Sequence, residues 1–350
     1  MDDAVDTLLS GPRGRRLCLE VAMRADPAVR TAAFLASLAF DQGHGVRYSS
    51  TEGCCSSERV APDPGPEEVA AAIDALPGDA VPDDVLREGL CASVDSAWYW
   101  QEPDGQDVLA SLPAVRSALV RVAEDVLASQ VGAEWTRPRG SEQWAVDWRP
   151  DSTRPLPLGA AALLEEWATA RRSEEEQAAR ERPTDPQARL SGTWWSLPLR
   201  PLRTQSRIED LLELVEDSAG LDAATVIPVV GDGRTLEIGS AADWEELCRT
   251  HPAEVTASRR HDWYRVTGWE GRWLIPDWQR VAADWDAVHL TTLGYLSAAT
   301  RLIPVGDDYG SVIAGWAPDS TLRLTDSAHE ADAPRQQWVR PSGEDRWRRV

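Results

Sequence analysis

The spacing of apolar residues changes along this chain, and that change most constrains the fold. Before residue 130, apolar side chains recur every three or four positions, as on one face of an α-helix. After Pro113, apolar residues are separated by four, three and four positions. Similar stripes follow Asp26-Pro27 and Pro82-Asp83-Asp84, and both of these motifs are typical of helix starts. We therefore expect three helices here, and a long loop over the Gly-, Ser- and Pro-rich residues 41–68.

A transition lies around residues 150–190. Residues 143–148 alternate as in a short strand, and a proline-rich stretch follows. A helix is expected over 160–182, and its second half is almost wholly charged or alanine. Because a helix that is polar on all sides is typically a solvated spacer, we interpret this helix as a linker and the run Glu174–Glu176 as a solvated face.

Beyond residue 190 the sequence favours strands with short helices between them. Residues 225–230 and 234–238 flank Gly231-Asp232-Gly233, which predicts a β-hairpin. Residues 255–266 are expected to form a strand. The remaining expected elements are short helices at 241–248 and 278–285, and strands at 288–296, 301–305, 311–316 and 321–324.

These elements predict an α+β fold, with a helical N-terminal domain followed by a mixed, mainly antiparallel α+β C-terminal domain. The expected divisions are a mainly helical domain over residues 1–150, a proline-rich segment and charged linker helix over 151–190, an α+β domain over 191–326 and a polar tail over 327–350.

The amino-acid composition excludes several classes of function. All 36 basic residues are arginine, and the chain has no lysine and no asparagine, for which a GC-rich genome is one explanation. Without lysine there is no phosphate-binding P-loop lysine, no kinase strand lysine and no Schiff base to pyridoxal phosphate. The net charge of −22 argues against nucleic acid and against anionic membranes as partners.

The expected location is the cytoplasm. The acidic start Met1-Asp2-Asp3 lacks the basic and apolar parts of a signal peptide, and no window approaches the roughly 18 apolar residues of a membrane span. The odd, sparse set of cysteines does not resemble a secreted disulfide framework. These cysteines are Cys18, Cys54, Cys55, Cys91 and Cys248.

The densest candidate site is the run from Arg259 to Arg265. In a strand, Arg259, His261, Trp263 and Arg265 would face one way and form a basic, aromatic surface. Arginine suits phosphate or carboxylate, and an indole can stack on a ring. We predict ligand binding by these four residues. The alternative is an edge strand whose arginines pair with the surplus acidic residues.

Other candidates carry weaker patterns. His289 lies within an apolar run, where a histidine is more often a core residue than a catalyst. Cys248 and His251 form a fragment of a zinc pattern without a fourth ligand, and the Cys54-Cys55 pair near His44 could bind metal or sense redox state. No catalytic residue is assigned, and we predict no cofactor and no metal.

Tryptophan is unusually frequent, with 17 Trp against 2 Phe. The seven within residues 244–316 are concentrated in one part of the chain, and Trp269 and Trp273 lie in a turn-like stretch. Exposed aromatic clusters are typical of ligand stacking or partner contacts, so we expect some exposure here and core packing for most of the others.

Several stretches resemble an uncharacterised protein family of high-GC actinobacteria, for which no activity is known. The stretches that carry the resemblance are 11–18, 99–105, 255–265, 276–278, 287–291 and 314–319.

A fainter similarity, over residues 278–324, is to bacterial ADP-ribosyltransferase-like domains. Those domains use an Arg or His on an early strand and a catalytic Glu, whereas this sequence has Asp319 at the corresponding place and no Ser-Thr-Ser strand. The resemblance therefore transfers no catalytic role.

Two functions follow from the sequence. The first is a cytosolic regulatory or interaction protein that recognises a protein partner or small anionic ligand through its Arg- and Trp-rich C-terminal domain. The alternative is an enzyme acting on a nucleotide or NAD-like substrate through Arg259, His261 and Arg265. Convergence of these three side chains with a carboxylate in one cleft would favour the enzyme.

Overall fold

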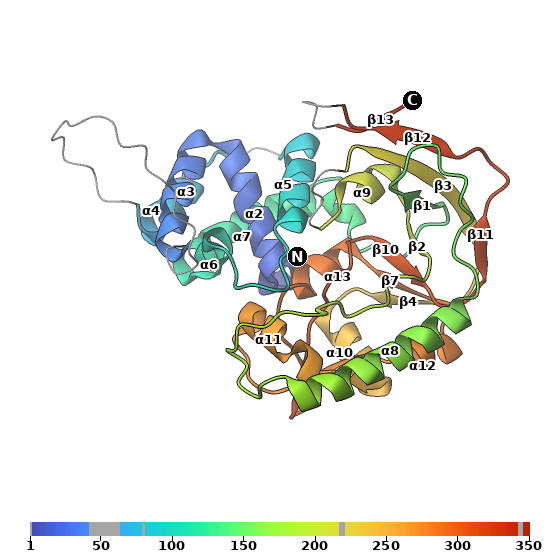
Figure 1. Ribbon diagram of the computed structural model, residues 1–350. Helices are drawn as coiled ribbons and strands as arrows, with labels where there is room; N and C mark the ends of the chain where they lie inside the picture. The colour runs from blue at the N-terminus through green and yellow to red at the C-terminus, as the bar shows by residue number, and fades with distance from the viewer. Residues whose placement is uncertain (1, 42–63, 79–80, 217–220, 342–345) are drawn as a thin grey trace, which may run out of the picture. The chain divides into compact units, whose positions relative to one another are not determined.

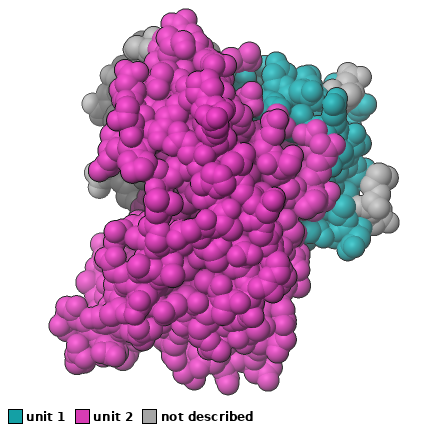
Figure 2. Space-filling model, turned by 90° about the vertical axis from the view of Figure 1, so that its right-hand side faces the viewer, with its two compact units in different colours: residues 1–93, 103–133 teal, residues 94–102, 134–350 magenta. Residues whose placement is uncertain are grey.

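The computed structural model describes residues 2–41, 64–78, 81–216, 221–341 and 346–350. It confirms the α+β class, with helices predominating in the N-terminal part and sheets in the C-terminal part (Figure 1). This described part of the chain divides into two compact units, coloured separately in Figure 2. Unit 1 comprises residues 1–93 and 103–133, and unit 2 comprises residues 94–102 and 134–350.

Unit 1 is built from helices, as predicted, but its described residues form seven helices rather than the three expected. Proline stands in the first turn of several of them, and the Asp104 side chain caps a further helix by accepting from the Asp107 amide. The helices are α1 (Asp2–Ser10), α2 (Pro12–Ala25), α3 (Pro27–Asp41), α4 (Pro66–Asp74), α5 (Asp83–Asp95), α6 (Gly105–Ser111) and α7 (Pro113–Ala128). Most of the predicted loop at 41–68 lies outside the described residues.

Unit 2 contains two sheets. Among the described residues, the larger has nine strands in the order β13-β12-β3-β1-β2-β10-β7-β4, with β11 also paired to β3, and the smaller has four in the order β5-β6-β9-β8. Strands of the larger sheet are β1 (Gln143–Asp147), β2 (Arg203–Gln205), β3 (Ala223–Gly231), β4 (Thr235–Ile238), β7 (Ala287–Leu290), β10 (Ser320–Arg323), β11 (Ala328–Glu330), β12 (Gln336–Val339) and β13 (Arg348–Arg349). Strands of the smaller are β5 (Pro252–Glu254), β6 (Arg272–Pro276), β8 (Ile303–Val305) and β9 (Tyr309–Ser311).

The described helices of unit 2 connect and cover these strands. Helix α8 packs along α11 and α12, as Figure 1 shows. These helices are α8 (Ala160–Glu181), α9 (Ile208–Glu213), α10 (Ala241–Thr250), α11 (Thr256–Thr267), α12 (Trp278–Asp284) and α13 (Thr292–Ala298). The short 3-10 helix η1 (Gly132–Glu134) contains the point along the chain where unit 1 ends and unit 2 resumes.

The predicted domain limits differ from these units. The boundary expected at 150–190 lies inside unit 2, because β1 already belongs to the large sheet and α8 packs on unit 2 helices. Residues 327–350, expected to be a polar tail, contain three strands that extend the same sheet.

The predicted hairpin at 225–238 is wrong. Strand β3 pairs with β1, β11 and β12, whereas β4 pairs in parallel with β7. The Asp286 carboxylate accepts from the Arg234 amide at 2.8 Å, and the Arg234 carbonyl accepts from the Asp286 amide at 2.9 Å. These bonds fix the start of β4 beside β7 and direct it away from β3.

Two predicted strands are wholly or partly helical. Residues 255–266 form α11, which ends at Gly268 with φ of +67°, a left-handed conformation that glycine adopts without strain. In the stretch 288–296, β7 ends at Leu290. The Thr291 hydroxyl then accepts from the Gly294 amide and caps α13.

Most tryptophans between residues 244 and 316 fill the core. Trp273 is fully buried, which contradicts the exposure expected around 269–276, and Trp269 and Trp285 are partly buried. Buried indole N–H groups need acceptors, and Trp244 donates to the Ser311 hydroxyl at 2.8 Å. The fully buried tryptophans of this stretch are Trp244, Trp263, Trp273, Trp278 and Trp316. No described helix has the length and apolarity needed to cross a membrane.

Candidate functional site

The four predicted ligand-binding residues lie on helix α11, so they do not share one face as they would on a strand. Along a helix, residues four apart are neighbours and residues two apart point in different directions. Arg259 therefore lies on the side of Trp263, and His261 on the side of Arg265.

Three of these four side chains are committed to the protein interior. Trp263 is fully buried and donates its indole N–H to the Trp194 carbonyl at 3.0 Å. Arg265 donates to the carbonyls of Trp100 and Leu190, at 2.7 and 2.9 Å. His261 is buried, and burial lowers its pKa. The contacts of Trp263 and Arg265 support a structural role for these two side chains. Within the described residues, neither ring nitrogen of His261 has a hydrogen-bond partner.

Arg259 differs, because it lines a cavity of about 470 Å³ together with Arg171. The cavity lies between α8 and the irregular segment 193–201. Helix α8 contributes one continuous face, since its lining residues are spaced by turns of the helix. The lining residues are Leu163, Glu166, Trp167, Ala170, Arg171, Glu174, Thr193, Trp195, Leu197, Pro198, Leu199, Arg200, Pro201 and Arg259.

Hydrogen bonds at Ser196 fix the outer wall of this cavity. Its backbone amide donates to the Ala314 carbonyl at 3.1 Å, and its carbonyl accepts from the Trp278 indole at 2.9 Å. Trp195 therefore stands on an anchored segment, and its ring stacks on Trp194 with 4.6 Å between centroids. Apart from Thr193 and Arg200, the side chains of this wall are aromatic or apolar.

Two of the three arginines that line the cavity are buried. Arg171 is 7% exposed and Arg259 is 2% exposed. Arg171 Nη1 donates to the Glu254 carbonyl at 3.2 Å, and Arg259 Nη1 lies 3.1 Å from Glu174 Oε2. Within the described residues the Nε atom of each arginine is buried and lacks a hydrogen-bond partner. Burial lowers the pKa of both guanidinium groups, because the charged form is desolvated.

The weaker candidates lie elsewhere. Cys248 is buried with its Sγ 3.6 Å from the Ser311 hydroxyl, and His251 Nε2 lies 3.4 Å from Asp284. Cys54, Cys55 and His44 lie outside the described residues. In the part of the chain that is described, no group of three or more His, Cys, Asp or Glu side chains is placed to hold a metal ion.

Sequence reasoning missed the α8 side of this cavity. Leu163, Trp167 and Arg171 are spaced by four residues each, which places them in one stripe. The sequence alone therefore places an indole beside a guanidinium on one face of this helix. The interpretation of the helix as a solvated linker did not take this face into account. Arg171 lies 5.8 Å from the centroid of the Trp167 ring, within cation–π range.

Comparison with protein families, curated proteins and solved structures found no match for this chain.

Proposed function

We propose that this protein binds a small anionic molecule with an aromatic or other apolar body, in the cavity between α8 and residues 193–201. The observation that carries the proposal is that two buried arginines, Arg171 and Arg259, line this cavity together with apolar side chains. Such a site suits a cytoplasmic regulatory or interaction protein, and the free thiols of Cys18 and Cys248 support that location.

The size and the charges of the cavity support this ligand class. Its volume falls within the range of roughly 300–1,000 Å³ that is typical of small-molecule sites. Its described lining carries three arginines against two glutamates, in a protein whose net charge is −22. A carboxylate or phosphate in the cavity would accept charge-assisted hydrogen bonds from the arginines.

The enzyme alternative stays a prediction. Convergence of Arg259, His261 and Arg265 in one cleft would have favoured it, whereas α11 directs Arg259 and Arg265 to different sides. Membership of the actinobacterial family likewise stays a proposal, and it adds no activity.

The test uses probes with one aromatic body and three different head groups. These are 2-naphthoate, 2-naphthalenemethanol and 2-naphthylmethylamine, titrated against intrinsic tryptophan fluorescence and against the melting temperature. We expect 2-naphthoate to bind and the alcohol and ammonium probes to bind at least tenfold more weakly. A ligand at 100 times its dissociation constant should add about 2.7 kcal/mol of stability.

Variants connect the binding to the cavity. Arg259→Gln and Arg171→Gln should each weaken naphthoate binding at least tenfold, whereas Arg249→Gln, on an exposed pair with Glu246, should leave it unchanged. Equal binding of the alcohol and the carboxylate would contradict an anion site. So would no response to naphthoate at a concentration of about 10 mM, which corresponds to a binding free energy weaker than about −3 kcal/mol.

A further inference from the structure

One carboxylate in the lining of the cavity is already bound to a buried arginine. Arg259 Nη1 donates to Glu174 Oε2 at 3.1 Å, and both side chains line the cavity between α8 and residues 193–201. Glu174 lies three residues beyond Arg171 on α8, so these two side chains share one face of the helix. The Glu174 oxygen thus occupies a position at which an anionic oxygen accepts from Arg259 in the cavity lining.

The two partners of this ion pair differ in exposure. The Arg259 side chain is 2% exposed, whereas the Glu174 side chain is 28% exposed. Arg259 is therefore held by the interior around it, while Glu174 has several rotatable side-chain bonds and reaches water. Rotation of Glu174 into solvent would leave Arg259 Nη1 facing the cavity without any movement of the backbone.

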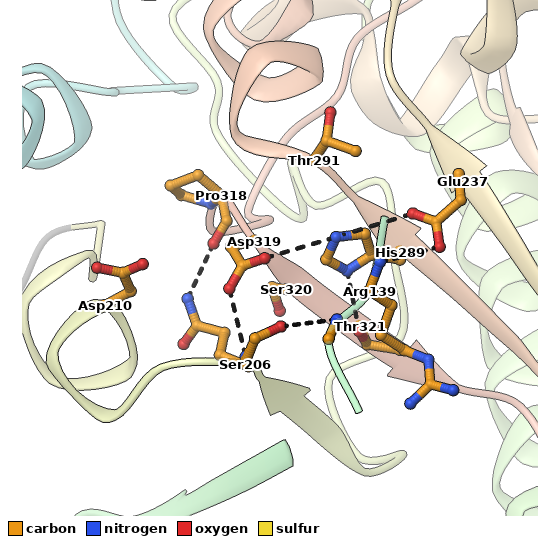
Figure 3. Close-up of polar contacts among 12 residues, drawn as sticks. Arg139, Ser206, Asp210, Glu237, His289, Thr291, Pro318, Asp319, Ser320 and Thr321 are labelled. Carbon is orange, nitrogen blue, oxygen red and sulfur yellow. Dashed lines mark hydrogen bonds and ion pairs between the residues drawn. The ribbon is translucent and has the colours of Figure 1, made fainter. Parts of the chain in front are cut away.

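Backbone amides hold other partly buried carboxylates of unit 2 in place. Beside the fully buried His289, the Asp319 carboxylate accepts from the Ser206 amide at 3.3 Å (Figure 3). Glu175 accepts from two amides at the start of α11, at 2.7 and 2.9 Å. Among the residues that the structure describes, the Glu174 side chain has one hydrogen-bond partner, the arginine. Glu174 is therefore the carboxylate of this group that can leave its place most easily.

The charges around the two buried arginines require a counter-charge. Burial lowers the pKa of Arg171, and the like charge of Arg259 acts in the same direction. Burial also lowers the pKa of Arg259, which Glu174 opposes most strongly and Glu175 less. Because a buried charge without a counter-charge is costly, Glu174 can leave Arg259 only when another anion takes its place.

We propose that Glu174 is an internal competitor of the ligand, whose anionic group displaces the Glu174 carboxylate from Arg259 and takes over its bond. The inference rests on the anion cavity proposed above. A neutral molecule of the same shape cannot replace the ion pair, so it leaves Glu174 on Arg259. The exchange therefore makes the cavity selective for anions, and the strength of the displaced pair limits their affinity.

The test compares two glutamates of α8 in the full chain. Glu174→Gln keeps the size of the side chain but weakens its bond to Arg259, because a neutral acceptor binds a guanidinium less strongly than a carboxylate does. We expect this variant to bind 2-naphthoate at least fivefold more tightly than the native protein in the fluorescence titration. Glu176→Gln removes the same charge from an exposed position outside the cavity lining and should change the dissociation constant less than twofold.

The neutral probe distinguishes displacement from simple access to the cavity. 2-Naphthalenemethanol has no charge to exchange, so the native protein and Glu174→Gln should bind it equally, within twofold. If the variant bound the alcohol fivefold more tightly as well, Glu174 would act by occupying space, and the proposal would be overturned. If Glu174→Gln does not fold, Glu174→Asp takes its place, because its shorter side chain lengthens the 3.1 Å bond and should tighten naphthoate binding at least twofold.

Failure of this inference differs from failure of the cavity itself. The same dissociation constant for naphthoate in the native protein and in Glu174→Gln would overturn the displacement alone. Equal tightening in Glu176→Gln would do the same. Absence of naphthoate binding by both the native protein and Glu174→Gln would overturn the anion cavity and this inference together.

Discussion

At the scale of single residues, Asp319 is held in an unusual state. Its backbone has φ of +52°, in the left-handed region, and its carboxylate accepts from the Ser206 amide at 3.3 Å. Its pKa is about 7 against an ordinary 3.8, so the folded state retains the proton more tightly than the unfolded state. The contribution of this proton to the free energy of unfolding is fully present below pH 4 and is lost as the pH rises through 7.

Asp319→Asn should therefore stabilise the protein at alkaline pH. Asparagine cannot ionise and adopts left-handed conformations readily. At pH 8 we expect a higher free energy of unfolding than in the native protein, by on the order of 1–3 kcal/mol, with the difference shrinking toward zero at pH 4. Chemical denaturation from pH 4 to 8 measures this difference.

Asp286→Asn is the matched control with the opposite sign. The Arg234 amide and the Thr325 hydroxyl bond this carboxylate and lower its pKa, so its stabilisation is present at neutral pH and is lost in acid. The variant should be less stable than the native protein at pH 8. If Asp319→Asn and the native protein had equal stability throughout, the proton-retaining environment of Asp319 would be refuted.

At the scale of elements, the packing of α13 on β4 depends on a missing side chain. A Cβ atom at Gly294 would lie 2.3 Å from the Ile238 carbonyl oxygen, which is backbone and cannot rotate away. Gly294→Ala should lower the free energy of unfolding by about 1–3 kcal/mol, although alanine is the better helix former by about 1 kcal/mol.

Gly239→Ala tests the same junction without the clash. There the nearest atoms to a Cβ are 3.7 Å away, so a change within about 0.5 kcal/mol is expected. Thermal and urea denaturation of both variants give the comparison. If the two substitutions had the same effect, close helix–strand contact would not be the reason for the glycine.

A carboxylate from α8 caps the N-terminus of helix α11. Glu175 accepts from the amides of Ala257 and Ser258, at 2.7 and 2.9 Å, and from the Ser258 hydroxyl at 2.6 Å. Glu175→Gln removes the charge and one acceptor, so we expect a loss of about 1–2 kcal/mol in urea denaturation. The exposed neighbour Glu176 is the control, and Glu176→Gln should change little. A similar loss in both variants would mean that the cap contributes nothing specific.

Sequence patterns correctly predicted those helices whose start is marked by residues adjacent in the sequence. Proline and apolar stripes identified α3 and α7, and the short helix predicted at 241–248 is α10, which Ser240 caps. Helix α11 was predicted as a strand because the Glu175 carboxylate that caps it lies some eighty positions earlier. The hairpin failed for a related reason, since its second strand is fixed by Asp286, a residue far along the chain.

The candidate site was predictable only in part. Arg259 was identified because arginines are dense around it, yet the predicted strand would have placed the wrong neighbours beside it. The α8 stripe through Trp167 and Arg171 was visible in the sequence. The covering segment was not, because it has no periodic structure and its position depends on the Ser196 bonds.

At the scale of the whole molecule, charge is distributed unevenly between interior and surface. Several arginines are buried in ion pairs, among them Arg13 with Asp107 and Arg16 with Glu20 and Asp104. Salt screens buried pairs far less than exposed charges. Against 58 acidic residues the chain has 36 arginines, so the excess of 22 negative charges repels itself, mainly at the surface.

This imbalance predicts that salt stabilises the protein at neutral pH. Between about 10 and 300 mM NaCl the Debye length falls from about 30 Å to below 10 Å, so repulsion among surface carboxylates weakens while the buried pairs persist. At pH 7.5 we expect the melting temperature to rise by several degrees over this range. Near pH 5.5, closer to the pI of about 4.6, the rise should be much smaller because the net charge is smaller. A melting temperature that falls with NaCl at pH 7.5 would show that exposed pairs such as Arg272–Glu254 contribute more than the repulsion costs.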